Sequence, residues 1–181
     1  MKRTIVTTHL ELTDPGQLVP AGPARVPHAI ARVEAPSPEL GRFLYTAVGG
    51  RWHWTDRLSW SRRDWVAHFE RPGAETWMMV ARGGPAGFFE LAPPDDGGVE
   101  IAMFGLLPEF IGEGLGGNLL SAAVRRVWES GAHRVWLHTC SLDHPSALAA
   151  YRARGFREFA RVESEREVPD QPPEPWPGAN R

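Results

Sequence analysis

The sequence predicts an α/β (mixed α+β) fold in which helices flank a central sheet. Segments with strand-type and helix-type patterns follow one another along most of the 181 residues. A glycine-rich turn, residues 112–117, joins one predicted strand to a long amphipathic pattern. Hydrophobic residues make up 42% of the chain, enough for a sizeable core at this length. We therefore expect one domain over residues 1–167 and a proline-rich tail over residues 168–181.

Residues 4–69 contain two strand patterns and two helix patterns. Residues 4–12 are rich in β-branched side chains, which favour strands, and a second strand is expected at residues 29–33. Apolar residues recur on one side of a predicted helix at residues 38–48, which ends at two glycines. A second helix is predicted at residues 61–69, with Ser61 as its N-cap.

Strand and helix patterns also alternate over residues 76–166. The expected elements are strands at 76–81, 87–91, 99–106, 134–139 and 157–166, and helices that begin at the glycine turn and at residue 146. Residues 93–98 read Pro-Pro-Asp-Asp-Gly-Gly, which is typical of a hairpin turn. Period-two alternation after this turn places Glu100, Ala102 and Phe104 on one face of their strand.

Charge and cysteine content exclude several classes of function. The formal net charge is −2, so nothing attracts the chain as a whole to nucleic acid or to an anionic membrane. The single cysteine, Cys140, permits no internal disulfide, which favours a reducing, cytoplasmic compartment. The first residues contain no long apolar run, so neither a signal peptide nor a membrane span is expected.

The glycine turn has the composition of an anion site. Gly112, Gly114, Gly116 and Gly117 lie between a predicted strand and a predicted helix. Glycines let backbone N–H groups approach a ligand closely, and a helix N-terminus adds unpaired donors and a positive dipole end. The turn therefore predicts a cradle for a phosphate or a diphosphate.

Two other phosphate-binding loops can be compared with this turn. A Walker loop ends in Gly-Lys-Ser/Thr, and the Asn118 that follows the glycines excludes it. A dinucleotide fingerprint, G-x-G-x-x-G, is satisfied by Gly112, Gly114 and Gly117, but the next predicted strand ends at His138 rather than at an acidic residue. A nicotinamide-binding fold stays open as an alternative.

Two motifs, taken together, resemble the GNAT (Gcn5-related) N-acetyltransferases. The family's acyl-coenzyme A loop, Gln/Arg-x-x-Gly-x-Gly/Ala, is matched by residues 111–116. Its closing motif, Asn-x-x-Ala-x-x-x-Tyr-x-x-x-Gly-Phe, is matched by residues 144–156. Ile111 and His144 stand where the family has Gln or Arg and Asn, respectively. The resemblance covers residues 77–165.

The resemblance implies a fold, a cosubstrate and a set of binding residues. The fold is a mixed, mostly antiparallel sheet of about six to seven strands flanked by about four helices. The cosubstrate is acetyl-CoA, with no metal. The residues that the resemblance places at the cofactor are Phe104, Gly105, Leu106, Ile111, Gly112, Glu113, Gly114, Leu115, Gly116, Gly117, His144, Ala147 and Tyr151.

Direct acetyl transfer needs a base for the amine, a donor to the thioester carbonyl and an acid for the leaving thiolate. The resemblance makes Tyr151 that acid, and a phenol with a pKa of about 10 stays protonated at neutral pH. Glu100 and Glu90 are the candidate bases, because a hairpin would bring them onto neighbouring strands, where each carboxylate raises the pKa of the other. Related enzymes often lack a single essential base, so this choice stays open.

A cluster of tryptophans precedes the matched region. Trp52 and Trp54 are candidates for an aromatic acceptor pocket, with Glu90 as a further substrate contact. Trp65 and Trp77 are expected in the core. The expected acceptor is a primary amine of a small molecule or peptide, and homodimers are common in the family. A non-catalytic acyl-CoA-binding module is the alternative function.

Four residues that can ligate metals lie close together in the sequence. His138, Cys140, Asp143 and His144 match no zinc spacing, so we expect no metal there. Asp143 is instead expected to hold the turn before the last helix, and His144 to cap that helix.

Overall fold

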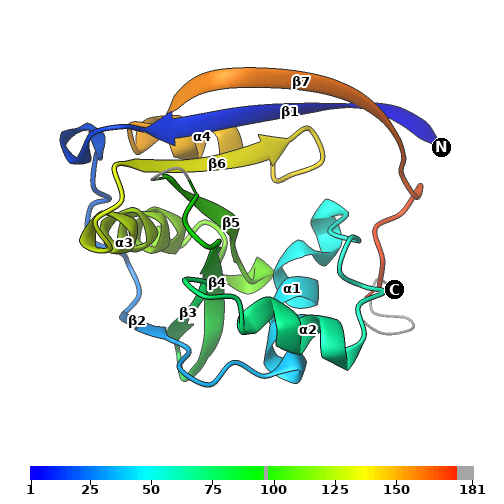
Figure 1. Cartoon of the computed structure of the whole chain (residues 1–181), viewed down its shortest axis with the longest axis horizontal. Helices are drawn as coiled ribbons and strands as arrows, with labels where there is room; N and C mark the ends of the chain where they lie inside the picture. Colours follow the sequence, from blue (N-terminus) through cyan, green and yellow to red (C-terminus); the bar gives the residue numbers. More distant parts are fainter. Residues whose placement is uncertain (96–97, 175–181) are drawn as a thin grey trace.

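One sheet runs through the whole fold. The computed structural model describes residues 1–95 and 98–174. Within these residues the strands form a seven-stranded sheet in the order β2-β3-β4-β5-β6-β1-β7 (Figure 1). Neighbouring strands are antiparallel except β5 and β6, which run parallel. The strands are β1 (Lys2–Leu12), β2 (His28–Arg32), β3 (Glu75–Ala81), β4 (Gly84–Leu91), β5 (Gly98–Leu106), β6 (Arg134–Cys140) and β7 (Arg157–Glu167).

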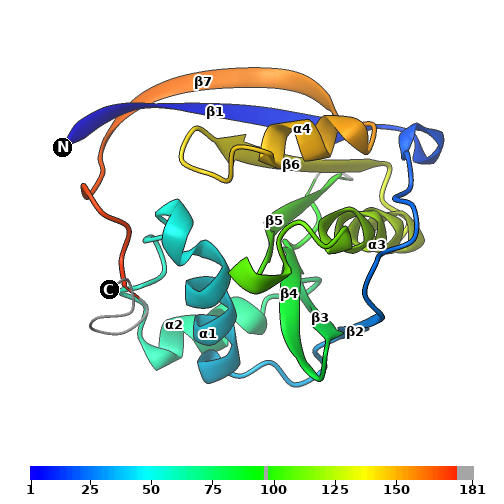
Figure 2. The same cartoon turned by 180° about the vertical axis from the view of Figure 1, so that it is seen from behind.

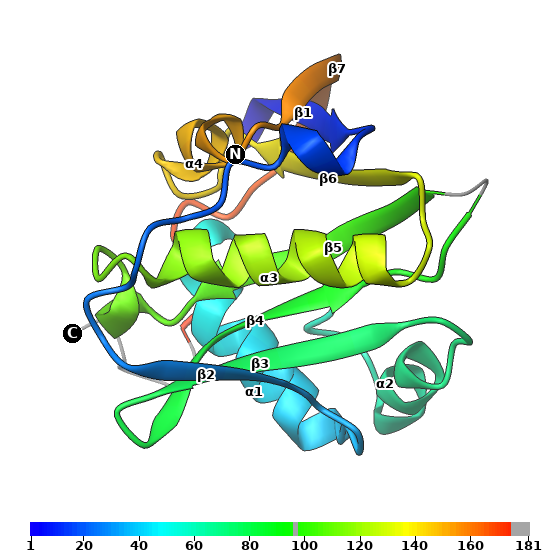
Figure 3. The same ribbon diagram turned by 90° about the vertical axis from the view of Figure 1, so that its left-hand side faces the viewer.

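Helices cover both faces of the sheet, so the predicted fold class is confirmed. The described residues form α1 (Pro38–Gly49), α2 (Arg62–Phe69), α3 (Leu115–Glu129) and α4 (Ala147–Ala153), with short 3-10 turns η1 (Pro15–Gln17), η2 (Gly50–Trp52) and η3 (Pro108–Phe110). Figure 3 shows α3 on one side of β4 and β5 and α1 on the other. Ser61 caps α2, as predicted, by accepting the N–H of Asp64.

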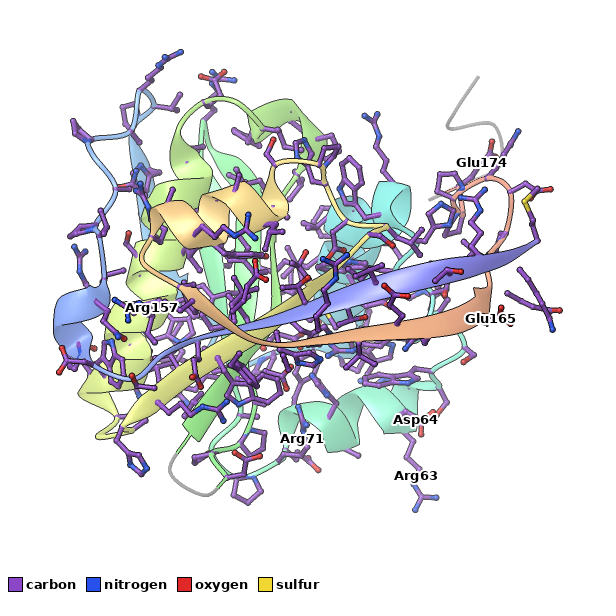
Figure 4. All side chains as sticks on the ribbon, turned by 90° about the horizontal axis from the view of Figure 1, so that it is seen from above. Arg63, Asp64, Arg71, Arg157, Glu165 and Glu174 are labelled. Carbon is purple, nitrogen blue, oxygen red and sulfur yellow. The ribbon has the colours of Figure 1, made fainter. Side chains whose placement is uncertain are left out.

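The sheet consists of two parts that are joined over a short stretch. The first part contains β2 to β5, and the second contains β6, β1 and β7. In the second part β1 and β7 lie side by side along their length, with α4 beside them (Figures 2 and 4). The N-terminal strand is therefore inserted between two strands from the end of the chain. Local sequence patterns did not predict this placement, because it depends on pairing between distant segments.

A β-bulge in β5 shifts the orientation of its side chains. Residues 90 and 91 of β4 lie opposite residues 103 and 101 of β5, so Ala102 is an extra residue on β5. A bulge moves the alternation by one residue and bends its strand. The prediction that Glu100, Ala102 and Phe104 share one face is therefore wrong, because Phe104 lies on the face of Ile101.

The core is built from the inner faces of the helices and the sheet. The apolar stripe of α3 is fully buried and includes Leu119 and Val124. Trp65 of α2 is 2% exposed, and the Trp77 ring stacks on Phe89 at a centroid distance of 5.9 Å. Trp65 is a core residue, as predicted, whereas Trp77 is partly buried and packs against the core rather than lying within it.

Two predictions extend outside the described residues. The predicted turn at 93–98 includes residues 96–97, and the predicted tail at 168–181 includes residues 175–181. In the described part of the tail, Val168 is buried and its N–H donates to the carbonyl of Met1 at 3.0 Å. No helix in the described part of the chain is long and apolar enough to cross a membrane.

Candidate active site

The sheet opens between β5 and β6. These strands pair through only three residue pairs, which end at Glu100↔Trp136. Beyond that pair, β5 is paired only with β4, and β6 only with β1, among the strands that the structure describes. Two facing strand edges are left without sheet partners, and such edges present backbone N–H and C=O groups to any extended ligand. The bulge at Ala102 lies just past the last shared pair and bends β5 at that point.

The glycine turn follows the open part of β5 and begins α3. Gly112 and Gly114 have φ values of +90° and +81°, which favour glycine, and Gly114 is the N-cap of α3. No side chain caps this helix end. The first amides of a helix have no partners within the helix, so those of residues 115–117 are available to an anion. The predicted helix start is confirmed, and anion binding there stays a prediction.

Two arginines that sequence reasoning missed lie beside the glycine turn. Arg82, in the turn between β3 and β4, pairs with Glu113 at 2.9 Å and thereby offsets the negative charge in the loop. Arg154 lies near the start of α3, because a Cβ added to Gly117 would come within 3.3 Å of its Nη1 atom. Both contacts join segments more than 30 residues apart, so no local motif could have indicated them.

Tyr151 lies against the open edge of the sheet. It is 7% exposed, and its ring contacts Phe104 of β5 at a centroid distance of 6.0 Å. Burial raises the pKa of the Tyr151 hydroxyl well above its ordinary value, and the negative charge of Asp143 adds to the effect. The hydroxyl therefore keeps its proton at neutral pH, which an acid that protonates a thiolate requires.

Glu90 has a different environment from the one predicted. Its carboxylate is 5% exposed and accepts hydrogen bonds from Arg57 at 2.7 Å and from His68 at 3.0 Å. Burial alone would raise the pKa of Glu90, but the His68 hydrogen bond and the Arg57 charge outweigh it, so the pKa is lowered. The expectation that a second carboxylate raises this pKa is therefore wrong. Glu90 lies opposite Met103 rather than beside Glu100.

The Arg57–Glu90 pair belongs to an aromatic cluster under α1 and α2. The Arg57 guanidinium lies 4.9 Å from the ring centre of Trp60 and 5.6 Å from that of Tyr45. His68 comes from α2, and Arg57 from the loop before it. A buried carboxylate held in this way ties that loop and α2 to the sheet.

Glu100 is the other predicted base, and it lies where the sheet opens. Its Oε1 atom is 3.0 Å from Nδ1 of His138 on β6. The side chains of His138 and Glu100 are 46% and 20% exposed, respectively. The hydrogen bond therefore joins the two strands at the point where their backbones separate.

The two candidate acceptor tryptophans differ in their surroundings. Trp54 packs against the rings of Tyr45 and Phe88. Its indole also lies against Gly49, where an added Cβ would come within 2.0 Å of the indole, so this position requires glycine. Trp52 meets the ring of His144 edge-on at 4.9 Å, which brings η2 next to the loop between β6 and α4. Trp54 is thus a packing residue at this position, and Trp52 is the one that reaches the segment before α4.

The loop between β6 and α4 is held by Asp143, as predicted. Its carboxylate accepts the hydroxyl of Thr139 at 2.7 Å and the N–H of Cys140 at 2.8 Å. Ser146, rather than His144, is the N-cap of α4, which begins at Ala147. His144 Nδ1 accepts the N–H of Ser146. Within the described residues, no group of three or more histidines, cysteines or carboxylates could hold a metal ion.

Comparison with known proteins agrees with this architecture. A sequence model of the acetyltransferase (GNAT) family matches residues 38–156, which confirms the predicted resemblance. A segment of 57 residues is 40% identical to a mycothiol acetyltransferase of Corynebacterium aurimucosum, and it covers 32% of this chain and 18% of that protein.

Solved structures show the same fold. A GCN5-related N-acetyltransferase from Sphaerobacter thermophilus aligns with a TM-score of 0.65 and 18% identity over 92% of this chain and 53% of that one. One from Kribbella flavida aligns with a TM-score of 0.61 and 23% identity over 90% of this chain and 58% of that one. The chain therefore spans only a little over half of these structures, and less than a fifth of the mycothiol acetyltransferase.

Proposed function

Because this chain belongs to the acetyltransferase (GNAT) family, we propose that it transfers an acetyl group from acetyl-CoA directly to a primary amine of a small molecule or peptide. The observation that carries the proposal is the open edge of β5, which leads into the uncapped start of α3. An extended ligand with a diphosphate can use both features at once, because the strand edge binds its extended part and the helix amides bind its anion.

The cosubstrate site contains backbone donors and few charged side chains. We assign the diphosphate to the amides of residues 112–117, and the extended arm of the coenzyme to residues 104–106 of β5. Ile111 is 40% exposed and offers no charge, so the backbone of the turn carries most of the contact. His144, Ala147 and Tyr151 complete the site from the side of α4.

The chemistry needs a polarised carbonyl, an acid and a base. A backbone N–H on the open edge of β5 can donate to the thioester oxygen. Tyr151 protonates the departing thiolate, which its retained proton allows. Glu100 lies where the sheet opens and assists the deprotonation of the amine. Glu90 is excluded from this set by its buried pairing with Arg57, which favours a structural role.

The acceptor enters from the side of η2, where Trp52 lies next to the loop before α4. An indole face attracts ammonium groups, which suits an amine acceptor. Reaction with a free amine needs no covalent enzyme intermediate, so the sole cysteine, Cys140, has no role in the chemistry.

Calorimetry and a turnover assay test the proposal together. The purified chain is titrated with acetyl-CoA and with NADH, and thiol release is followed with a polyamine, an aminosugar and a peptide with a free N-terminus. We expect binding of acetyl-CoA and amine-dependent release of CoA. Binding of acetyl-CoA without thiol release for any of the three amines favours a non-catalytic acyl-CoA-binding module. Binding of NADH without acetyl-CoA binding contradicts the proposal.

A further inference from the structure

The hydrogen bond between Glu100 and His138 occupies a distinctive place in the fold. It joins Glu100 of β5, whose backbone forms the last pair with β6 at Trp136, to His138 further along β6, with an Oε1–Nδ1 distance of 3.0 Å. A carboxylate can only accept, so Nδ1 of His138 carries the hydrogen. In the neutral ring Nε2 then has a free lone pair. No described residue forms a hydrogen bond with this Nε2 atom, and the side chain is 46% exposed.

His138 and Tyr151 lie on opposite faces of the open sheet. His138 is between Leu137 and Thr139, which are 1% and 5% exposed and belong to the inner face of β6. Alternation therefore directs His138 to the outer face, where its ring lies 5.6 Å from that of His9 on β1. Tyr151 comes from α4 and is buried with the inner face. A thioester lying between the strands would have an acid on one side and a base on the other.

Charges from several elements surround the His138 ring. The Glu100 hydrogen bond is the main influence and raises the pKa of His138, while partial burial opposes it. Asp143 in the loop after β6 raises this pKa further, and Arg166 on β7 lowers it. The pKa of His9 is lowered, first by burial and then by the charge of His138. Because its own pKa is lowered, His9 adds no competing proton at neutral pH. The raised pKa of His138 makes its ring a stronger base than an ordinary histidine.

We infer that His138 is the base that removes the proton from the acceptor ammonium, and that Glu100 is the positioning residue that fixes its tautomer. This refines the proposed acetyl transfer and rests on it. Nε2 takes one proton from the ammonium and later releases it to solvent. The free amine forms a bond to the thioester carbon, the carbon–sulfur bond breaks, and sulfur leaves with the electron pair. Sulfur takes the Tyr151 proton, and the second proton lost by nitrogen restores the phenol.

Matched substitutions separate this role from a structural one. His138→Asn keeps a side-chain amide at the Nδ1 position, so the bond to Glu100 can persist, but it cannot accept a proton. We expect kcat/KM to fall about a hundredfold at neutral pH, with acetyl-CoA affinity unchanged. The activity of this variant should recover as rising pH supplies free amine. His9→Gln, on the neighbouring strand, is the control and should stay within about threefold of the parent. His138→Gln is the second variant if the first does not fold.

The pH profile and a direct titration complete the test. Activity of the parent should rise with pH through the pKa of His138. Glu100→Gln removes the charge that raises this pKa, so its profile should shift to lower pH, and NMR titration of the His138 ring should show the same shift. If His138→Asn keeps the parental rate and profile, the inference is overturned while the proposed acetyl transfer stands. If the parent binds acetyl-CoA but acetylates no amine, the proposed function fails and takes the inference with it.

Discussion

Glu90 and Glu100 lie on adjacent strands, yet their surroundings differ, and we propose a different role for each. Glu90 is buried between Arg57 and His68 under an aromatic cluster, in the closed part of the sheet. Glu100 is partly exposed at the point where β5 and β6 separate, and its partner is a half-exposed histidine. Arg57 and His68 keep the first carboxylate ionised and fixed in place, whereas the second lies where we propose that a ligand binds. Residue type alone therefore does not identify a candidate catalytic acid or base. Whether the residue lies in the closed or in the open part of the sheet distinguishes the two glutamates.

The largest expected effect concerns the closed region. Arg57→Ala leaves the Glu90 carboxylate buried without its cation, and removal of one partner of a buried ion pair costs about 3–5 kcal/mol. We expect the free energy of unfolding to fall by that amount in urea titrations. Arg42→Ala is the control, because the hydrogen bond that its side chain donates to the Leu58 carbonyl is exposed, and it should change stability little. A loss below about 1 kcal/mol for Arg57→Ala would show that the cluster is not structural.

The next effect concerns the open region. Tyr151→Phe removes the proposed proton donor without removing the ring that packs on Phe104. We expect kcat to fall about a hundredfold, with the dissociation constant of acetyl-CoA unchanged. Steady-state kinetics and calorimetry on the same preparation measure both quantities. Equal losses in binding and turnover would assign the hydroxyl to binding instead.

A matched pair of glycines distinguishes binding from stability. Gly112 and Gly131 have φ values of +90° and +83°, and neither has an atom within 4 Å of an added Cβ. Alanine at either position costs about 1–2 kcal/mol of stability, because a left-handed backbone disfavours a side chain. Only Gly112→Ala should weaken acetyl-CoA binding, by about tenfold. Equal affinities for the two variants would contradict the assignment of the diphosphate to this turn.

The smallest effect is a dependence of stability on pH. The pKa of Glu90 is lowered in the folded chain from its ordinary value of 4.5, so its contribution is fully present above that value. Stability should fall as pH drops below it and Glu90 takes up a proton. Thermal unfolding of Glu90→Gln should show a flatter decline over this acidic range. A slope identical to that of the parent would mean that other carboxylates, such as Glu75 with Arg126, account for the decline.

Sequence patterns predicted the local elements well, because periodicity, caps and glycine stops act over a few residues. The helix start at Gly114 and the capping of α2 by Ser61 are examples. The arrangement of distant segments could not be predicted in this way. The insertion of β1 between β6 and β7 and the pairing of Glu90 with Arg57 both join segments that no short motif connects.

The bulge at Ala102 shows the same limit on a smaller scale. One extra residue places the side chains that follow it on the opposite faces of the strand from those that simple alternation predicts. The local alternation pattern does not indicate this residue. The same bulge lies where β5 separates from β6. The sequence therefore did not predict the irregularity that accompanies the opening of the candidate site. The hydrogen bond between Glu100 and His138 joins residues 38 positions apart, and the sequence did not predict it either.

The central claim is that the open edge of β5 and the start of α3 bind acetyl-CoA. Titration of the isotope-labelled chain with acetyl-CoA, followed by amide NMR shifts, tests it most directly. We predict the largest shifts at residues 104–106 and 112–117, with little change around Glu90. Shifts confined to the closed region near Arg57 and His68, with the glycine turn unchanged, would contradict the account.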